Sequence, residues 1–439
     1  MTDIPQTGGG RPARRTDDGT GAAQTGGGRP APRWSELARL KESTHMYDAV
    51  IDEIDGRRIR IGDHWLADFA SCNYLGFDLD PEIMASIEGQ VRRWGTHPSW
   101  SRLLGNPRLY PEIEERLTEL TGAPDTLVLP TITHIHMSVI PVIAQCDTAG
   151  RNSAAGTVFC EAQAHRTVFD GCSVARGQGA TLRRWYQDDP DRLREMLRDC
   201  PADRPRLVCM DGVNSMTGNA PRLPEIAALC REEGALLYVD DAHGFGVIGE
   251  RRGDETSPYG ARGNSVVRHL DESYENLILI GGFSKAYSSL LAFLALPTRL
   301  KELLKFAAAP YLYSGPSPTA SLATVLAGFD VNETRGDAIR ADLYRKTKRV
   351  LDQVRALRLD CPNTSGFPVI EIPLKSDADL EDVAAQLWKR GIYVTLAAYP
   401  LVPRNQAGFR VQVTAANTDS EIDELNAALV ELGPLLRTW

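Results

Sequence analysis

Apolar and polar residues follow two alternating patterns through the middle of the chain. Between about residues 81 and 295, stretches with helical spacing of apolar residues are separated by short apolar runs. Such runs are typical of strands that are buried on both faces, and the helices between them cover those faces. The pattern therefore predicts an α/β domain. The runs are LVLP, GTVFCEA, RLVCMDGV, ALLYVDDAHG and NLILIGGFS.

The clearest unit of this kind lies between residues 206 and 246. RLVCMDGV is expected to form a buried strand, LPEIAALCREE a helix, and ALLYVDD the next strand. Gly234 follows the last apolar position of the helix, where glycine commonly forms a C-terminal cap. The order strand, helix, strand predicts a β-α-β crossover.

Smaller pieces flank this domain. The stretch WSELARLKESTHMYDAV has helical spacing, and short β-like pieces follow at residues 58–61 and 65–69. Near the C-terminus, strands at 368–372 and 408–413 lie among a long helical region, the helix LEDVAAQLWKRG and a last helix, which predicts a small α+β domain. We therefore divide the chain into residues 1–33, 34–80, 81–318 and 319–439.

The first 33 residues contain the sequence QTGGGRPA twice, in a setting of Gly, Pro, Arg and Thr. A segment with so little apolar surface to bury is expected to be a disordered and dispensable tail. Two copies are too few for a stacked repeat protein, which needs about three units. A local duplication of low-complexity sequence is the simpler interpretation.

Composition and charge narrow the class of protein. The 439 residues are 42% hydrophobic and 24% charged, as in soluble globular proteins. The chain has 49 Lys and Arg against 58 Asp and Glu, a net charge of −9, which argues against general binding to nucleic acid. It has no secretory apolar region and no run of about 18 apolar residues. The eight cysteines form no CxxC pair. We expect a reduced, cytoplasmic protein without a membrane span.

Reactive side chains follow three of the predicted strands. Ser215 comes after RLVCMDGV, Asp240 and His243 come at the end of ALLYV, and Lys285 comes after LILI. Ligands of α/β sheets bind beyond the carboxyl ends of the strands, so these groups are expected to meet. An amine held by a turn is suited to form a Schiff base, and a facing carboxylate can keep a pyridine nitrogen protonated. Together these two roles describe a site for pyridoxal 5′-phosphate.

Six motifs occur along the chain in one order: NYLGF (73–77), SRLLGNPRLYPEIEERL (101–117), DGVNSMTGNAPRLPEI (211–226), VDDAHGFGVIG (239–249), GGFSKA (281–286) and FRVQVTAANT (409–418). On these motifs the chain, from about residue 73 to 419, resembles the α-oxoamine synthases. This family of pyridoxal-phosphate enzymes of fold type I includes the 8-amino-7-oxononanoate, 5-aminolevulinate, 2-amino-3-ketobutyrate and sphingoid-base synthases.

The resemblance implies catalytic and cofactor-binding roles for five residues. Lys285 matches the lysine that forms the Schiff base with the cofactor, and Asp240 matches the carboxylate that pairs with its pyridine nitrogen. His243 and Ser215 match the two partners of the phenolic oxygen. His165, in EAQAHRTVFDG, matches the histidine that stacks on the cofactor ring.

The resemblance also implies a substrate-binding role for two residues. Arg410 matches the arginine that binds the carboxylate of the amino acid, for which a bidentate guanidinium is suited. Asn73 is expected to assist it, or to serve only as a turn former.

The phosphate end departs from the family pattern. Residues 131–134 read Thr-Ile-Thr-His where the family has a Gly-aromatic pair, and Gly282 stands where it has a hydroxyl residue. A helix N-terminus there still offers amide donors and a partial positive charge. We expect phosphate contacts from Thr131, Ile132, Thr133, Ser284 and Ser314.

Two further positions carry open interpretations. His134 and His136 form an HxH pair; we expect no metal there, because no third ligand has a matching spacing. Packing is the leading interpretation, with a substrate or phosphate contact as the alternative. Trp100 stands where the family commonly has glycine, and its larger side chain is expected to reshape the acyl channel.

The resemblance implies an aminotransferase-like fold with a mostly parallel sheet, a homodimer, and the joining of a small α-amino acid to an acyl thioester with loss of carbon dioxide. The identities of the amino acid and the acyl group stay open, as does the choice between coenzyme A and a carrier protein. An aminotransferase and a non-catalytic scaffold are the alternatives. The presence of Lys285, Asp240, His243 and Ser215 argues against the scaffold.

Overall fold

The computed structural model describes residues 35–146 and 153–439, so the predictions made for the N-terminal tail lie outside the described residues. Its largest sheet has seven strands in the order β4-β10-β9-β8-β7-β5-β6. All neighbouring pairs are parallel except those of β10, which is antiparallel to β4 and β9. The strands are β4 (Asp125–Leu129), β5 (Thr157–Glu161), β6 (Thr181–Trp185), β7 (Arg206–Asp211), β8 (Leu236–Asp240), β9 (Leu277–Gly282) and β10 (Ala292–Leu296).

Helices cover both faces of this sheet, as the sequence predicts. On β8, Leu237 and Val239 belong to one buried cluster and Leu236 and Tyr238 to the other, because successive side chains of a strand point to opposite faces. One face packs against α4 (Ile132–Ile143), α5 (Arg166–Gly177), α9 (Thr298–Ala307) and α10 (Ala309–Leu312). The other packs against α3 (Leu109–Thr121), α6 (Pro190–Arg198), α7 (Leu223–Glu232), α8 (Val266–His269) and α11 (Thr319–Ala356).

The predicted β-α-β crossover is confirmed by β7, α7 and β8. The helix ends at Glu232, and Gly234 has a φ of 63°, the left-handed conformation that lets the chain turn back into β8. The short segments between a strand and its helix lie along one edge of the sheet. This is where the reactive residues of the sequence are expected.

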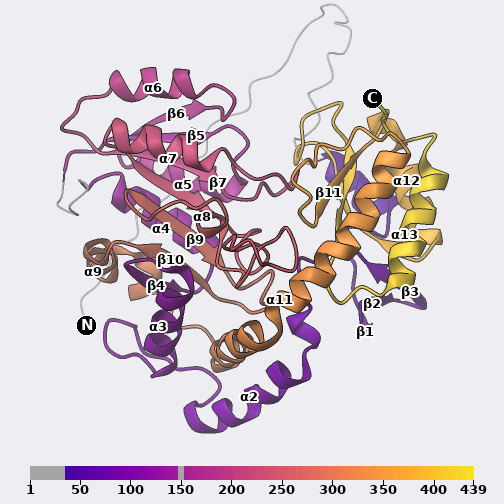
Figure 1. Cartoon of the computed structure of the whole chain (residues 1–439), viewed down its shortest axis with the longest axis horizontal. Helices are drawn as coiled ribbons and strands as arrows, with labels where there is room; N and C mark the ends of the chain where they lie inside the picture. The colour runs from indigo at the N-terminus through magenta and orange to yellow at the C-terminus, as the bar shows by residue number, and fades with distance from the viewer. Residues whose placement is uncertain (1–34, 147–152) are drawn as a thin grey trace, which may run out of the picture.

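The long helix α11 leads from the large sheet to the C-terminal part of the chain (Figure 1). There, three antiparallel strands in the order β11-β14-β13 lie with helices α12 and α13. These elements are β11 (Val369–Pro373), the 3₁₀ helix η2 (Asp377–Asp379), α12 (Leu380–Lys389), β13 (Thr395–Ala397), β14 (Gly408–Gln412) and α13 (Asp419–Leu432).

The N-terminal strands join this C-terminal part. They form one sheet in the order β1-β2-β3-β12, in which β12 (Ile392–Tyr393) pairs in parallel with β3. Helix α1 is shorter than the predicted helix, since the chain bends after Ser43 and Asp48 has a positive φ of 53°. The remaining N-terminal elements are α1 (Ser35–Ser43), β1 (Glu53–Asp55), β2 (Arg58–Ile61), β3 (His64–Asp68), η1 (Phe77–Leu79) and α2 (Pro81–Trp94).

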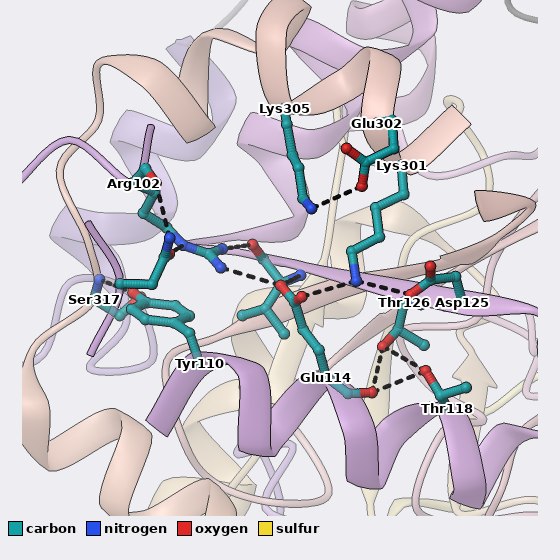
Figure 2. A network of polar contacts seen from close by, with 12 residues as sticks. Arg102, Tyr110, Glu114, Thr118, Asp125, Thr126, Lys301, Glu302, Lys305 and Ser317 are labelled. Carbon is teal, nitrogen blue, oxygen red and sulfur yellow. Dashed lines mark hydrogen bonds and ion pairs between the residues drawn. The ribbon is translucent and has the colours of Figure 1, made fainter. Parts of the chain in front are cut away.

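A buried ionic network fixes the segment before α3 to the sheet (Figure 2). Arg102, only 4% exposed, donates to Glu114 at 3.1 Å and to the carbonyl of Val128 in β4. Glu114 also pairs with Lys301 at 3.0 Å, and Lys301 bonds Asp125 at 2.7 Å. Each charge therefore has a partner, which buried charges require.

Among the described residues, no helix is long and apolar enough to cross a membrane.

Candidate active site

A cavity of about 160 Å³ lies at the carboxyl ends of the parallel strands. Parallel strands end at the same edge of a sheet, so residues that follow different strands meet there. The register places Asp211 of β7 beside Asp240 of β8. The cavity is lined by Thr131, Ile132, Thr133, His165, Thr167, Asp211, Val213, Ser215, Asp240, Ala242, His243, Ser284 and Lys285.

Nine of the sequence-predicted site residues line this cavity, and three do not. Arg410 is adjacent to the lining, because its Nη1 donates to the carbonyl of Ser215 at 2.6 Å. Asn73 precedes Tyr74 outside the lining, and Ser314 is an exposed residue of the segment before α11. The expected contacts of Asn73 and Ser314 stay predictions.

Asp240 is the buried carboxylate of the site, with 5% of its surface exposed. Its Oδ1 accepts the backbone N–H of Ala242 at 3.1 Å, and its Oδ2 lies 3.0 Å from His136 Nε2. Burial raises the pKa of Asp240, but His136 and the amine of Lys285 outweigh it and lower the pKa to about 2. Asp240 therefore stays charged near neutral pH and can hold a cation that enters the cavity.

His243 is held in a neutral state. Burial and the cations Lys285 and Arg410 lower its pKa well below the ordinary value. Its Nδ1 lies 2.8 Å from the hydroxyl of Tyr74, whose own pKa is raised by burial. A phenol that keeps its proton donates to Nδ1, which leaves the proton of the imidazole on Nε2. His243 can thus present an N–H donor to an oxygen in the cavity.

Asp211 is a site residue that the sequence reasoning missed. It is buried and accepts the backbone N–H of His165 at 2.9 and 3.1 Å. Burial and the nearby charge of Asp240 raise its pKa well above the ordinary value. The signal that could have found it is its position as the last residue of a buried strand, in register with Asp240.

His165 lies at the exposed rim of the cavity and begins α5 as its N-terminal cap. Its Nδ1 is 2.8 Å from the hydroxyl of Thr167, and its backbone is held by Asp211. Partial burial of the ring lowers the pKa of His165, the charge of Asp240 opposes this shift, and Lys285 adds to it. A neutral imidazole over the cavity is suited to stack on a flat ligand ring.

Lys285 supplies the amine. It follows β9 and is half-buried at the cavity wall. Among the described residues, its Nζ has no hydrogen-bond or ion-pair partner. A lysine that faces a cavity beside a carboxylate and two neutral histidines, yet remains unpaired, is available for a covalent bond to an aldehyde.

Arg410 lies on β14, one strand of the C-terminal sheet. Its Nη1 bonds the carbonyl of Ser215, while its Nε is buried and has no partner among the described residues. A buried guanidinium nitrogen without an acceptor costs free energy until an acceptor arrives. A substrate carboxylate fits this need.

The phosphate end is altered in two places that touch each other. Thr131 caps α4, with its hydroxyl accepting the N–H of His134 at 3.3 Å. Ile132 begins the helix, and its Cδ1 would lie 2.4 Å from a Cβ at Gly282. The missing side chain at 282 therefore makes room for the isoleucine. The remaining donors on this wall are the hydroxyls of Thr133 and Ser284.

The HxH pair lies on α4, and its two members face different surroundings. His134 is exposed, whereas His136 is fully buried between Tyr238 and Asp240. Residues two positions apart on a helix do not share a face. His136 thus contacts a carboxylate of the site rather than substrate or phosphate. Trp100 is 58% exposed, and its effect on an acyl channel stays a prediction.

Comparison with known proteins identifies the family. Residues 69–429 match the family model of aminotransferase class I and II. The 8-amino-7-oxononanoate synthase of Chromohalobacter salexigens is 32% identical over 82% of this chain and 87% of its own length. The corresponding enzyme of Pseudomonas putida is 30% identical over 87% and 90%.

The chain belongs to the α-oxoamine synthases. It is therefore a pyridoxal-phosphate-dependent C-acyltransferase, and its cofactor is pyridoxal 5′-phosphate. The predicted aminotransferase-like fold is confirmed by a serine palmitoyltransferase of S. paucimobilis, solved with a cofactor–myriocin adduct. That structure has a TM-score of 0.80 and 21% identity, and covers 91% of this chain and 97% of its own.

The site of this α-oxoamine synthase fits its cofactor. The cavity offers an unpaired amine for the aldehyde and a charged carboxylate for the ring nitrogen. The neutral His243 offers a donor for the phenolic oxygen, and helix α4 begins at the cavity wall, where its N-terminus is suited to a phosphate.

Proposed function

We propose that the enzyme condenses a small α-amino acid with an acyl thioester, releasing carbon dioxide and a thiol to give an α-amino ketone. The observation that carries the proposal is the combination of Lys285, Asp240 and His243 around one cavity with Arg410 at its edge. The relatives named 8-amino-7-oxononanoate synthase support this reaction class.

The cofactor supplies an electron-withdrawing ring that stabilises negative charge at the α-carbon of the amino acid. Asp240 would keep the ring nitrogen protonated, and His243 would donate from Nε2 to the phenolic oxygen. Lys285 would hold the cofactor through its aldehyde and, when its amine is free, would accept the proton of the substrate's α-carbon at Nζ. His165 covers the ring at the rim.

Arg410 orients the amino acid. Its Nε, which has no partner among the described residues, offers an N–H donor to the substrate carboxylate, while Nη1 stays on the carbonyl of Ser215. The carboxylate is thereby held beside Lys285 until it leaves as carbon dioxide. We place Ser215 and Asn73 as assisting groups, and the phosphate between the start of α4 and Ser284.

The proposal includes a homodimer. Four large apolar side chains are exposed on two neighbouring segments. The two segments are joined by a hydrogen bond of 2.8 Å from Ser101 Oγ to the carbonyl of Leu312. The four side chains are Trp100, Leu103, Leu104 and Tyr313. An apolar patch of this kind favours burial against a partner, and a second copy would cover it and bring the neighbouring Ser314 toward the partner's phosphate site.

The absence of a CxxC pair supports action in the cytoplasm.

The direct test incubates holoenzyme with small amino acids and a panel of acyl thioesters, on coenzyme A and on carrier protein. Free thiol, carbon dioxide and the mass of the product are measured together. Equal amounts of all three products support the condensation. A keto acid without carbon dioxide would instead identify an aminotransferase.

A second experiment tests Lys285 separately. Borohydride reduction of holoenzyme followed by peptide mapping is expected to place the cofactor on Lys285. In the Lys285→Ala variant, both the adduct and turnover should disappear. An adduct on another lysine in the wild-type protein would contradict the assignment.

A further inference from the structure

We propose that His136 is a positioning residue for the cofactor's ring nitrogen: it holds Asp240 in place as a charged carboxylate, and Tyr238 fixes its tautomer. The inference rests on the proposed function, because it takes Asp240 as the partner of that nitrogen. His136 itself does not line the cavity and acts through Asp240.

The three side chains form one line of hydrogen bonds. Tyr238 and Asp240 are two positions apart on β8, so both point toward the face that α4 covers. His136, in the second turn of α4, spans them: Nδ1 lies 2.9 Å from the Tyr238 hydroxyl and Nε2 lies 3.0 Å from Asp240 Oδ2. His136 and Tyr238 are completely buried, so water does not compete for these bonds.

The position of the protons follows from the donors available. Burial raises the pKa of Tyr238, which therefore keeps its proton and donates to Nδ1 of His136. The imidazole then carries its own proton on Nε2 and donates it to Asp240. The carboxylate thus keeps its full charge for the ring nitrogen.

Asp240 needs this donor chiefly because it is buried, and other acids also lie close to it. Asp211 lies beside it on β7, and Glu161 ends the next strand, with a pKa that burial raises to about 7. The cations that face Asp240 are Lys285 and, when protonated, His165. If His136 were apolar, burial and the neighbouring acids would favour a proton on Asp240. A protonated acid cannot keep the ring nitrogen cationic.

The proposed positioning role of His136 and a simple packing role require different properties of the side chain at position 136. A packing role needs only volume, whereas the proposed role needs an N–H donor at the position of Nε2. Gln places an amide N–H at nearly the same reach, and Leu fills a similar volume without any donor. The pair His136→Gln and His136→Leu therefore separates the two roles.

The experiment measures the ring nitrogen directly. Each variant is reconstituted with cofactor labelled with ¹⁵N in the ring, and the ¹⁵N chemical shift reports whether that nitrogen is protonated. Asp240→Asn is the reference for a lost carboxylate. We expect His136→Leu to move the shift toward the Asp240→Asn value and to slow α-proton exchange of a bound amino acid about tenfold or more. We expect His136→Gln to stay near the wild-type value.

Tyr238→Phe tests the tautomer and remains informative if His136→Leu does not fold. Without the phenol, Nδ1 loses its donor, so the shift is expected to move in the same direction by a smaller amount. A wild-type ¹⁵N chemical shift in His136→Leu would overturn the role of His136. If His136→Leu does not fold, a wild-type shift in Tyr238→Phe would overturn it instead. An unchanged shift in Asp240→Asn would instead overturn the proposed role of Asp240.

Discussion

The contact between Ile132 and Gly282 leads to a quantitative prediction about the altered phosphate end. A Cβ at position 282 would lie 2.4 Å from Ile132 Cδ1 and 3.0 Å from its Cγ1. The best separation of two carbon atoms is about 3.5–4.0 Å, so Gly282→Ala must displace the isoleucine. Ile132 begins α4 and lines the cavity at the wall where we propose that the phosphate binds, so its displacement should weaken cofactor binding.

The size of the effect follows from how freely Ile132 can move. Overpacking of a filled site costs about 1–3 kcal/mol. Ile132 is half-buried and the clashing atoms are at the end of its side chain, so the lower part of this range applies. A cost of about 1 kcal/mol corresponds to about a fivefold higher dissociation constant for the cofactor. Ile132→Ala removes both clashing atoms, and the double variant should regain most of the affinity.

The assay is a cofactor titration of four proteins: wild type, Gly282→Ala, Ile132→Ala and the double variant. The coupling free energy of the cycle isolates the contact between the two positions. If the double variant binds the cofactor as weakly as Gly282→Ala, the two departures are independent and the reasoning fails.

Two other glycines serve as controls for that cycle, measured by denaturant unfolding. A Cβ at Gly281 would lie 2.2 Å from Cζ of the fully buried Phe293, so Gly281→Ala should destabilise the fold itself. Gly89, in helix α2, has nothing within 4 Å of its Cβ position. Gly89→Ala is expected to leave cofactor affinity unchanged and to stabilise the protein slightly.

Three further predictions test other parts of the structure. Arg410→Lys keeps the positive charge but loses the planar guanidinium with its several N–H donors. The apparent dissociation constant of the amino acid should therefore rise about tenfold or more, while the absorbance of the bound cofactor stays the same. Unaltered affinity would mean that the carboxylate binds elsewhere. Tyr74→Phe removes the donor to Nδ1 of His243 and should shift the visible absorbance of the bound cofactor, and an identical spectrum would speak against a fixed tautomer. Glu114→Leu leaves the guanidinium of Arg102 buried without its carboxylate partner. In a denaturant titration, the free energy of unfolding should fall by about 3–5 kcal/mol. A loss under about 1 kcal/mol would show that the ionic network rearranges around the change.

Local patterns in the sequence were enough to predict the sheet and the centre of the site. The apolar runs correspond to strands, and the residues that follow them, Ser215, Asp240, His243 and Lys285, line one cavity. The reason is geometric: parallel strands end at one edge, so sequence position relative to a strand end already determines spatial position. The roles of these residues in catalysis remain predictions until the experiments above are done.

Interactions between distant segments could not be predicted in this way. Tyr74 bonds His243 through its hydroxyl, and its carbonyl accepts the backbone N–H of Ala415, just past β14, at 2.8 Å. The separate N-terminal strands likewise share a sheet with β12, more than three hundred residues later in the chain. The spacing of apolar residues along a helix or strand indicates which of its faces is buried. It does not indicate which other element covers that face.

The sequence by itself determined the α/β class, the family and the chemical groups at the strand ends. Only the tertiary structure decided that His136 bonds Asp240, that Asp211 belongs to the site, and that Ile132 occupies the space left by Gly282. Each of these depends on the position at which α4 or a neighbouring strand packs against another element. Packing distances of a few ångströms are set by all the side chains in the interface together, and no local stretch of sequence contains them.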